Sequence, residues 1–140
     1  MYKRVLLPLS GDNRNDRTWK ALEKAQAICD GELIILHVTA PISQAISGSG
    51  REEVINEDTN HAIMLLEPVV ERLRMSKAHF HTRIVSGTVA DTIIRIADEE
   101  EADVIVMYTD GREGLADFLL GSVTERVLRD TNKDLLAIRG

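Results

Sequence analysis

The distribution of apolar positions divides the chain into short and long segments that alternate. Short, mainly apolar runs typical of β-strands lie at residues 4–9, 33–38, 79–85, 103–107 and 135–138. The first two runs are almost unbroken in apolar character, as expected of strands that are covered on both faces. The third run alternates apolar and polar residues, which predicts a strand at the edge of a sheet.

The segments between these runs have apolar residues at helical spacing, so we expect four helices. They cover residues 15–29, residues 53–75, a segment that begins at Thr88, and residues 122–129. Asp30 and Gly31 are expected to end the first helix, and Pro68 to kink or divide the second. Residues 39–52, with Pro41 and the run Ser47-Gly48-Ser49-Gly50, are predicted to form a mobile loop.

This alternation of strands and helices predicts the fold class. Strands that are joined through helices pair in parallel by right-handed crossovers, which brings helices to both faces of the sheet. We therefore expect an α/β protein with one doubly wound, Rossmann-like domain. The 140 residues contain no internal repeat, linker or low-complexity segment. Residues 1–140 are accordingly interpreted as a single domain.

Composition and charge restrict the kinds of binding partner and the cellular compartment that we expect for this protein. The net charge is −6, from 17 basic and 23 acidic residues. A nucleic-acid surface needs clustered Lys and Arg, so we expect no nucleic-acid partner, and the charge gives no reason to expect a membrane. The apolar runs are too short for a spanning helix of ~20 residues, and residues 1–4 lead into a strand without a signal segment. A lone cysteine, Cys29, cannot form an internal disulfide, which favours the cytoplasm.

The chemistry is expected at the carboxyl ends of the strands, where open parallel sheets bind ligands. The segment after the fourth predicted strand contains Gly111 and Gly114, which permit a positive φ and a close approach of a ligand to the backbone. Gly121 and Ser122 open a helix whose first residues, Ser122–Glu125, have the pattern of a capping box. Free N–H groups at such a helix start suit a phosphate. In the alternative interpretation, these glycines only turn the chain and Ser122 only caps the helix.

Four segments together resemble the universal stress protein family: residues 1–8, 36–38, 102–107 and 119–127. The last of them, L-L-G-S-V-T-E-R-V, is the most specific, and the resemblance runs the length of the chain. It implies a five-stranded sheet of order 3-2-1-4-5 and a homodimer in which residues 135–139 meet. It also implies a stress-response regulatory protein without a shared catalytic centre. Many members bind ATP or a related adenine nucleotide through the pattern G-x-x-G-x9-G-S/T.

This sequence keeps part of that nucleotide pattern. Gly111 takes the place of the second glycine, and Gly121 and Ser122 follow at the family's spacing. The first glycine is replaced by Tyr108, and the aspartate that usually follows the first strand is replaced by Ser10. The candidate nucleotide-binding residues that the resemblance implies are Pro8, Leu9, Ser10, Val38, Met107, Tyr108, Gly111, Gly121, Ser122 and Val123.

The two replacements change the chemistry expected at the site. A tyrosine ring at position 108 either blocks the pocket or supplies a stacking face. Ser10 can form one hydrogen bond, but it cannot hold two hydroxyl groups as a carboxylate does. Like charges repel one another in the segment that follows, so a bound triphosphate would need Mg²⁺ or Mn²⁺. The charged residues of that segment are Asp110, Arg112, Glu113 and Asp117.

Three functions remain open on the sequence. The first is a regulatory protein that binds ATP or AMP, in which the nucleotide orders residues 108–120 and 39–52 and alters the surface offered to an unidentified protein partner. The second is a dimeric interaction protein in which Tyr108 fills the pocket and no nucleotide binds. The third, a slow ATPase, is the least favoured, because no pair of nucleophile and base can be identified.

Other chemistry-bearing residues have simpler interpretations. Cys29 lies on the apolar stripe of the first helix and is expected to be a core residue. His37 ends a buried strand, where it either packs or lines the mouth of the pocket. His79 and His81 share one face of the edge strand, which allows a metal ligand pair but favours exposure to solvent. The acidic run 98–101 is interpreted as a solvated helix end and a possible docking patch.

Overall fold

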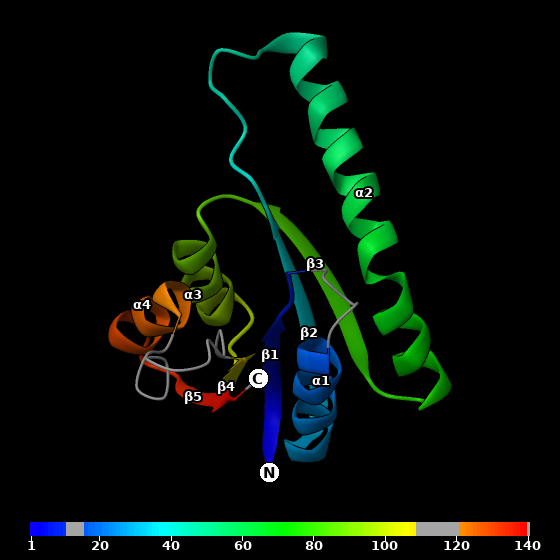
Figure 1. Ribbon diagram of the computed structural model, residues 1–140, viewed down its shortest axis with the longest axis vertical. Coiled ribbons are helices and arrows are strands. Elements are labelled where there is room, and N and C mark those ends of the chain that lie inside the picture. The colour runs from blue at the N-terminus through cyan, green and yellow to red at the C-terminus, as the bar shows by residue number, and fades with distance from the viewer. Residues whose placement is uncertain (11–15, 109–120, 140) are drawn as a thin grey trace.

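The computed structural model describes residues 1–10, 16–108 and 121–139. Five parallel strands form one sheet in the order β3-β2-β1-β4-β5, and the helices lie on both of its faces (Figure 1). The fold class and the strand order expected above are both confirmed. The elements are β1 (Tyr2–Pro8), α1 (Asp16–Ile28), β2 (Cys29–Thr39), α2 (Gly48–Met75), β3 (Phe80–Ser86), α3 (Val89–Glu99), β4 (Val104–Tyr108), α4 (Ser122–Asp130) and β5 (Asp134–Ile138).

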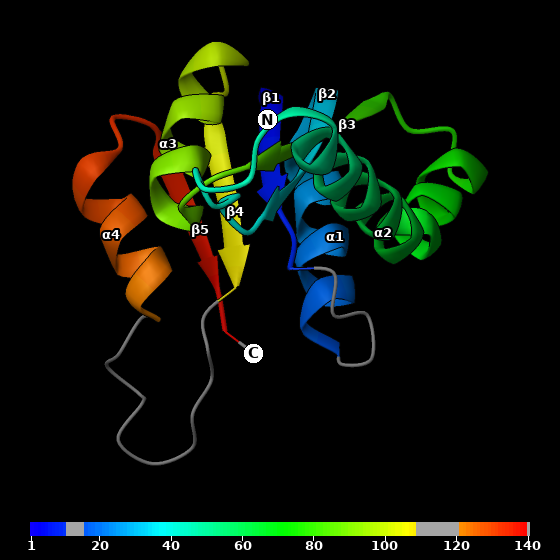
Figure 2. The ribbon, with the colours of Figure 1, turned by 90° about the horizontal axis from the view of Figure 1, so that it is seen from above.

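The sheet separates two hydrophobic clusters because side chains alternate between the faces of each strand. On one face, α1 and α2 pack against β1, β2 and β4 through Ala21, Leu22, Ala25, Leu66, Val69 and Leu73. On the other face, α3 and α4 pack against the same strands through Ala90, Ile93, Ile96, Ala97 and Val127. Figure 2 separates the two helix pairs on opposite sides of the sheet. The central strands are therefore apolar on both faces, whereas β3 lies at an edge, as its alternating pattern predicted.

Helix α2 differs from the prediction at its start and at its proline. It begins at Gly48, five residues before the expected position, so the Gly-Ser run forms its first turn instead of a loop. Pro68 lies inside the helix without dividing it. Both Pro68 and Met64, whose carbonyl group loses its helical partner, are exposed, so water can hydrate that carbonyl. Of the two alternatives expected at Pro68, a kink or a division, the division is therefore excluded.

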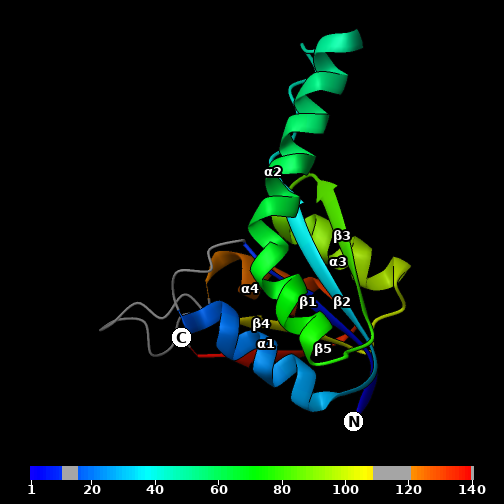
Figure 3. The same ribbon diagram turned by 90° about the vertical axis from the view of Figure 1, so that its right-hand side faces the viewer.

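The two halves of α2 have different environments. Its buried residues, Ala62, Leu66, Val69 and Leu73, all lie in the second half. The first half extends past the end of the sheet, which Figure 3 presents in side view. Sequence patterns identify the half that packs against a core, because packing imposes the apolar spacing.

The described residues contain no helix that is long and apolar enough to cross a membrane.

The start of β2 also departs from the prediction. Helix α1 ends at Ile28 and β2 begins at Cys29, so Asp30 and Gly31 belong to the strand and do not form a helix stop. The register between β1 and β2 shifts between Tyr2 and Arg4. At this irregularity the backbones approach so closely that a Cβ atom on Gly31 would overlap the carbonyl oxygen of Lys3. Gly31 is therefore required by the close approach of two strands.

The acidic run at the end of α3 is not simply solvated. Glu100, whose side chain is 14% exposed, forms ion pairs with Arg4, His81 and Arg83. Glu99 pairs with Arg83 and Arg95, and these contacts lower the pKa of its carboxyl group. The run thus ties the end of α3 to β1 and β3, at the edge of the sheet opposite the carboxyl ends of the strands.

His81 is the centre of this charged group. Its Nδ1 lies 2.7 Å from Oε1 of Glu32, and its Nε2 lies 2.8 Å from Oε2 of Glu100. Burial alone would lower the pKa of His81, but the hydrogen bonds to Glu32 and Glu100 outweigh burial and raise it. His79 precedes the strand and is exposed, so the two histidines do not form a common site.

Candidate functional site

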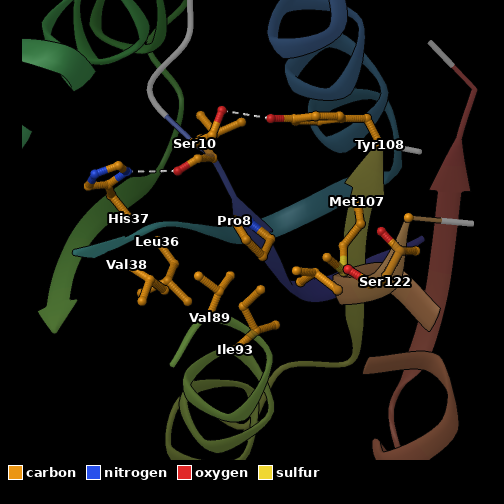
Figure 4. A pocket seen from close by; sticks show the side chains of 14 residues that line it. Pro8, Ser10, Leu36, His37, Val38, Val89, Ile93, Met107, Tyr108 and Ser122 are labelled. Atoms are coloured by element: carbon orange, nitrogen blue, oxygen red, sulfur yellow. Dashed lines mark hydrogen bonds between the residues drawn. The ribbon is translucent and has the colours of Figure 1, made fainter. Parts of the chain in front are cut away.

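A cavity of about 300 Å³ opens at the carboxyl ends of the central strands (Figure 4). It lies between the ends of β1, β2 and β4 and the first turns of α3 and α4. This is the position at which the strand order reverses, because β2 and β3 lie on one side of β1, whereas the chain then crosses to β4 and β5 on its other side. The lining residues are Pro8, Leu9, Ser10, Leu36, His37, Val38, Val89, Ile93, Met107, Tyr108, Gly121, Ser122, Val123 and Thr124.

The apolar wall of the cavity follows from strand and helix periodicity. Leu36, Val38 and Met107 belong to the hydrophobic cluster on the α3 and α4 face of the sheet. From α3, Val89 and Ile93 are four residues apart and therefore line the same side of the cavity. In Figure 4, Val38, Val89 and Ile93 lie below Pro8, and Met107 lies beside it. The wall offers a flat aromatic group apolar contact on several sides.

The polar side of the cavity is formed by the start of α4. Gly121 is the N-cap, and the helix begins at Ser122 with no side-chain capping bond. The predicted cap at Ser122 was therefore displaced by one residue. Thr88 is the N-cap of α3, as expected, but its side chain forms no capping bond either. The first N–H groups of α4 have no acceptor within the helix, and the helix dipole favours an anion there.

The two unusual positions of the nucleotide pattern contact each other. The hydroxyl oxygens of Ser10 and Tyr108 lie 2.8 Å apart in a hydrogen bond in which either can be the donor. Figure 4 shows the two side chains pointing toward one another at the rim of the cavity. The Tyr108 ring packs against the cluster on the α1 face, whereas Met107 packs on the other face. The ring therefore borders the cavity and leaves its volume open.

His37 is buried, and one of its ring nitrogens has a hydrogen-bond partner in the backbone. Its side chain is 8% exposed, and Nδ1 lies 2.8 Å from the carbonyl oxygen of Leu9. A carbonyl oxygen only accepts hydrogen bonds, so Nδ1 carries a proton and donates it. This bond ties the end of β2 to the segment that follows β1. His37 thus both packs and lines the cavity, which combines the two interpretations that the sequence left open.

The structure gathers nine of the ten candidate residues around this cavity: Pro8, Leu9, Ser10, Val38, Met107, Tyr108, Gly121, Ser122 and Val123. Gly111 lies outside the described residues, as do the charged positions Asp110, Arg112, Glu113 and Asp117. The cavity is also lined by residues that were not predicted from the sequence: Leu36, Val89, Ile93 and Thr124. Leu36 is two residues from Val38, and Val89 and Ile93 open a helix at the same edge, so periodicity contained the signal.

The described lining of the cavity carries no Asp, Glu, Lys or Arg side chain. Within the same described part of the chain, no group of three or more His, Cys, Asp and Glu residues is arranged to hold a metal ion. The chemistry available from these residues is therefore hydrogen bonding by hydroxyl and backbone N–H groups, combined with apolar contact. Such a lining suits a ligand with an apolar ring at one end and an anion at the other.

Known proteins resemble this chain in sequence and in fold. The model of the universal stress protein family matches residues 1–139. Universal stress protein MJ0531 of Methanocaldococcus jannaschii is 27% identical over 144 residues, which cover 99% of this chain and 83% of that protein. The structure of MJ0577 from the same organism has a TM-score of 0.78 and 30% identity, covering 100% of this chain and 97% of the other. A universal stress protein in complex with cAMP has a TM-score of 0.74 and 24% identity, with coverage of 98% and 97%.

Proposed function

Because this chain belongs to the universal stress protein family, we propose that it is a stress-response regulatory protein that binds an adenine nucleotide, ATP or AMP, in the cavity at the carboxyl ends of β1, β2 and β4. The observation that carries the proposal is the open volume of about 300 Å³ between an apolar wall and the start of α4. The cAMP complex of a neighbour with the same fold supports it. In this role the protein acts by binding and has no catalytic centre.

In this proposal the two ends of the cavity bind different parts of the nucleotide. The adenine ring packs against Val38, Val89 and Met107, where its burial is favourable and no charged side chain competes. The phosphates lie at Gly121 and Ser122, where backbone N–H groups and the helix dipole stabilise negative charge. A divalent cation, Mg²⁺ or Mn²⁺, would bind through the phosphates and offset the acidic residues Asp110, Glu113 and Asp117.

We further propose that the protein forms a dimer and that nucleotide binding acts through this dimer. Residues 1–140 form one domain that dimerises through residues 135–139. Strand β5 pairs with β4 along one edge, and its other edge has no partner strand in the part of the chain that the structure describes. Such an edge can pair with a second copy. Tyr108 pairs with Ile138, so the cavity and this edge are one strand apart and a ligand can influence the surface offered to a regulatory partner in the cytoplasm.

A pair of tryptophan variants tests whether the cavity is the binding site. Val89 lines the cavity and is 43% exposed, so Val89→Trp is expected to fill the cavity without disturbing the core. Leu128 lies on α4, is 50% exposed and does not line the cavity, which makes Leu128→Trp the matched control. We expect calorimetric titration with ATP and Mg²⁺ to detect binding to the wild type and to Leu128→Trp, and no binding to Val89→Trp.

The same titration separates this proposal from a nucleotide-free interaction protein. If both tryptophan variants bind ATP with the same affinity as the wild type, the nucleotide binds at another surface of the protein. Absence of binding by the folded wild type would favour the interaction protein. The position of the Tyr108 ring, which packs on the α1 side and leaves the cavity open, argues against that alternative.

A further inference from the structure

Helix α2 has one long face that is exposed from its first turns to its last. Its buried side packs on the sheet, and α1 lies on another side, where the Trp19 ring stacks on the guanidinium group of Arg72. Ile63 precedes Arg72 by nine residues, about two and a half helical turns, so it points away from α1. The exposed face around Ile63 consists of Glu53, Asn56, Asn60, Ile63, Met64, Glu67, Glu71 and Arg74.

The first half of α2 has little support from the rest of the chain. None of residues 48–61 is buried, and Figure 3 shows this half extending past the sheet. It contains Gly48 and Gly50, which disfavour a helix, and it has neither a side-chain bond at the N-cap Ser47 nor an acidic residue in its first turn. A helical segment of this length is marginal without packing. Contact with a second surface would therefore stabilise it.

The exposed face is complementary to itself when two copies of α2 run antiparallel. If the two-fold axis passes between residues 63 and 64, residues equally far from that point lie opposite one another. Ile63 of one copy then lies opposite Met64 of the other. These side chains are 50% and 74% exposed in the single chain, and together they form an apolar centre. The other opposite pairs are Glu53 with Arg74, Asn56 with Glu71, and Asn60 with Glu67.

Each of these outer pairs is chemically matched. Glu53 and Arg74 have opposite charges, and in the two asparagine–glutamate pairs the amide N–H group can donate to the carboxylate. The charges along the helix favour the same direction. Residues 51–58 contain four acidic side chains and one basic one, whereas residues 72–77 contain three basic side chains and no acidic one. A parallel pair would place like charges together, so charge selects the antiparallel pair.

We propose that the exposed face of α2 binds a second copy of this chain, with the two α2 helices antiparallel. The contact is mainly polar around a small apolar centre, so it forms reversibly and depends on protein concentration. It lies beside β3 at one edge of the sheet, whereas β5 lies at the other edge (Figure 1). The contact can therefore coexist with a dimer through residues 135–139, and it does not depend on a bound nucleotide.

Exchanging the charges of one pair tests the arrangement. Analytical ultracentrifugation over a range of concentrations measures self-association of the wild type, Glu53→Arg, Arg74→Glu and the double variant. Each single substitution should weaken association by about fivefold or more, because two-fold symmetry turns two attractive contacts into repulsive ones. The double variant restores opposite charges in both contacts, so its association constant should return to within about threefold of the wild-type value.

The matched control is Glu23→Arg, which makes the same change of charge at an exposed position on α1 and should associate as the wild type does. Equal weakening by Glu23→Arg, or a double variant no better than the single ones, would overturn the inference. Association that no α2 variant changes would overturn it while leaving the dimer through residues 135–139 in place. A wild type that is monomeric at every concentration would overturn both contacts, without bearing on the nucleotide site.

Discussion

Raising the pH should destabilise the fold through His81. Both ring nitrogens of His81 face carboxylate oxygens, from Glu32 on β2 and from Glu100 after α3. Only the imidazolium form can donate on both sides, and the pKa of His81 is raised in the folded protein. A group with a raised folded pKa stabilises the fold fully below its unfolded pKa of about 6.5 and loses that contribution as the pH rises through the folded value. Stability should therefore fall as the pH rises above about 6.5.

The size of this loss of stability depends on how far the charged side chains around His81 are exposed to solvent. The side chains of His81 and Glu32 are 38% and 32% exposed, so solvent screens their attraction, whereas Glu100 is 14% exposed. Arg4 and Arg83 also contact Glu100 and share its charge, which further limits the loss when His81 becomes neutral. At about 0.2–1 kcal/mol for each partly exposed pair, the two pairs together contribute roughly 0.5–2 kcal/mol. For a domain of this length the melting temperature should change by about 2–8 °C.

Thermal unfolding of the wild type and His81→Gln between about pH 5.5 and 9 measures this contribution. Glutamine keeps a polar side chain but removes the titration, so the wild type should lose its advantage over the variant as the pH rises. His79→Gln is the control, because His79 is exposed and lies two residues away. Parallel curves for the wild type and His81→Gln across this range would refute the reasoning, and so would an equal effect of His79→Gln.

Two further predictions concern packing. Leu66 is fully buried in the second half of α2, so Leu66→Ala should lower the free energy of unfolding by about 2–5 kcal/mol. Ile63 is 50% exposed, so the control Ile63→Ala should change the free energy of unfolding by less than about 0.5 kcal/mol. Equal losses of the two variants in urea unfolding would contradict the packing of α2. Gly31→Ala should cost about 1–3 kcal/mol, because its Cβ would overlap the Lys3 carbonyl oxygen, and unchanged stability would show that the two strands separate there without cost.

Most of the fold could be predicted because burial imposes its pattern on the sequence. The strand at residues 33–38 is apolar except at His37 because helices cover both of its faces, and it lies within β2. Where side chains are exposed, that constraint is absent. Gly48 and Gly50 begin a helix whose first half packs against no buried cluster, so composition indicated a loop and no apolar spacing corrected it.

The candidate site was accessible to prediction for a different reason. The carboxyl ends of parallel strands meet at one edge, so Ser10, Val38 and Tyr108 could be brought together from topology and a family pattern alone. The contact between Ser10 and Tyr108 spans 98 residues of sequence, and that between His81 and Glu32 spans 49. Such pairs depend on strand register and side-chain direction, which local patterns do not contain.

The most direct test of the proposed nucleotide site is calorimetric titration of the wild-type protein with ATP, first with Mg²⁺ and then with EDTA. We predict heat that saturates at one nucleotide per chain in the presence of the metal, a weaker response in EDTA, and a melting temperature that rises with excess ATP because the ligand binds the folded state. No heat in either condition, together with an unchanged melting temperature under excess ATP, would contradict the account.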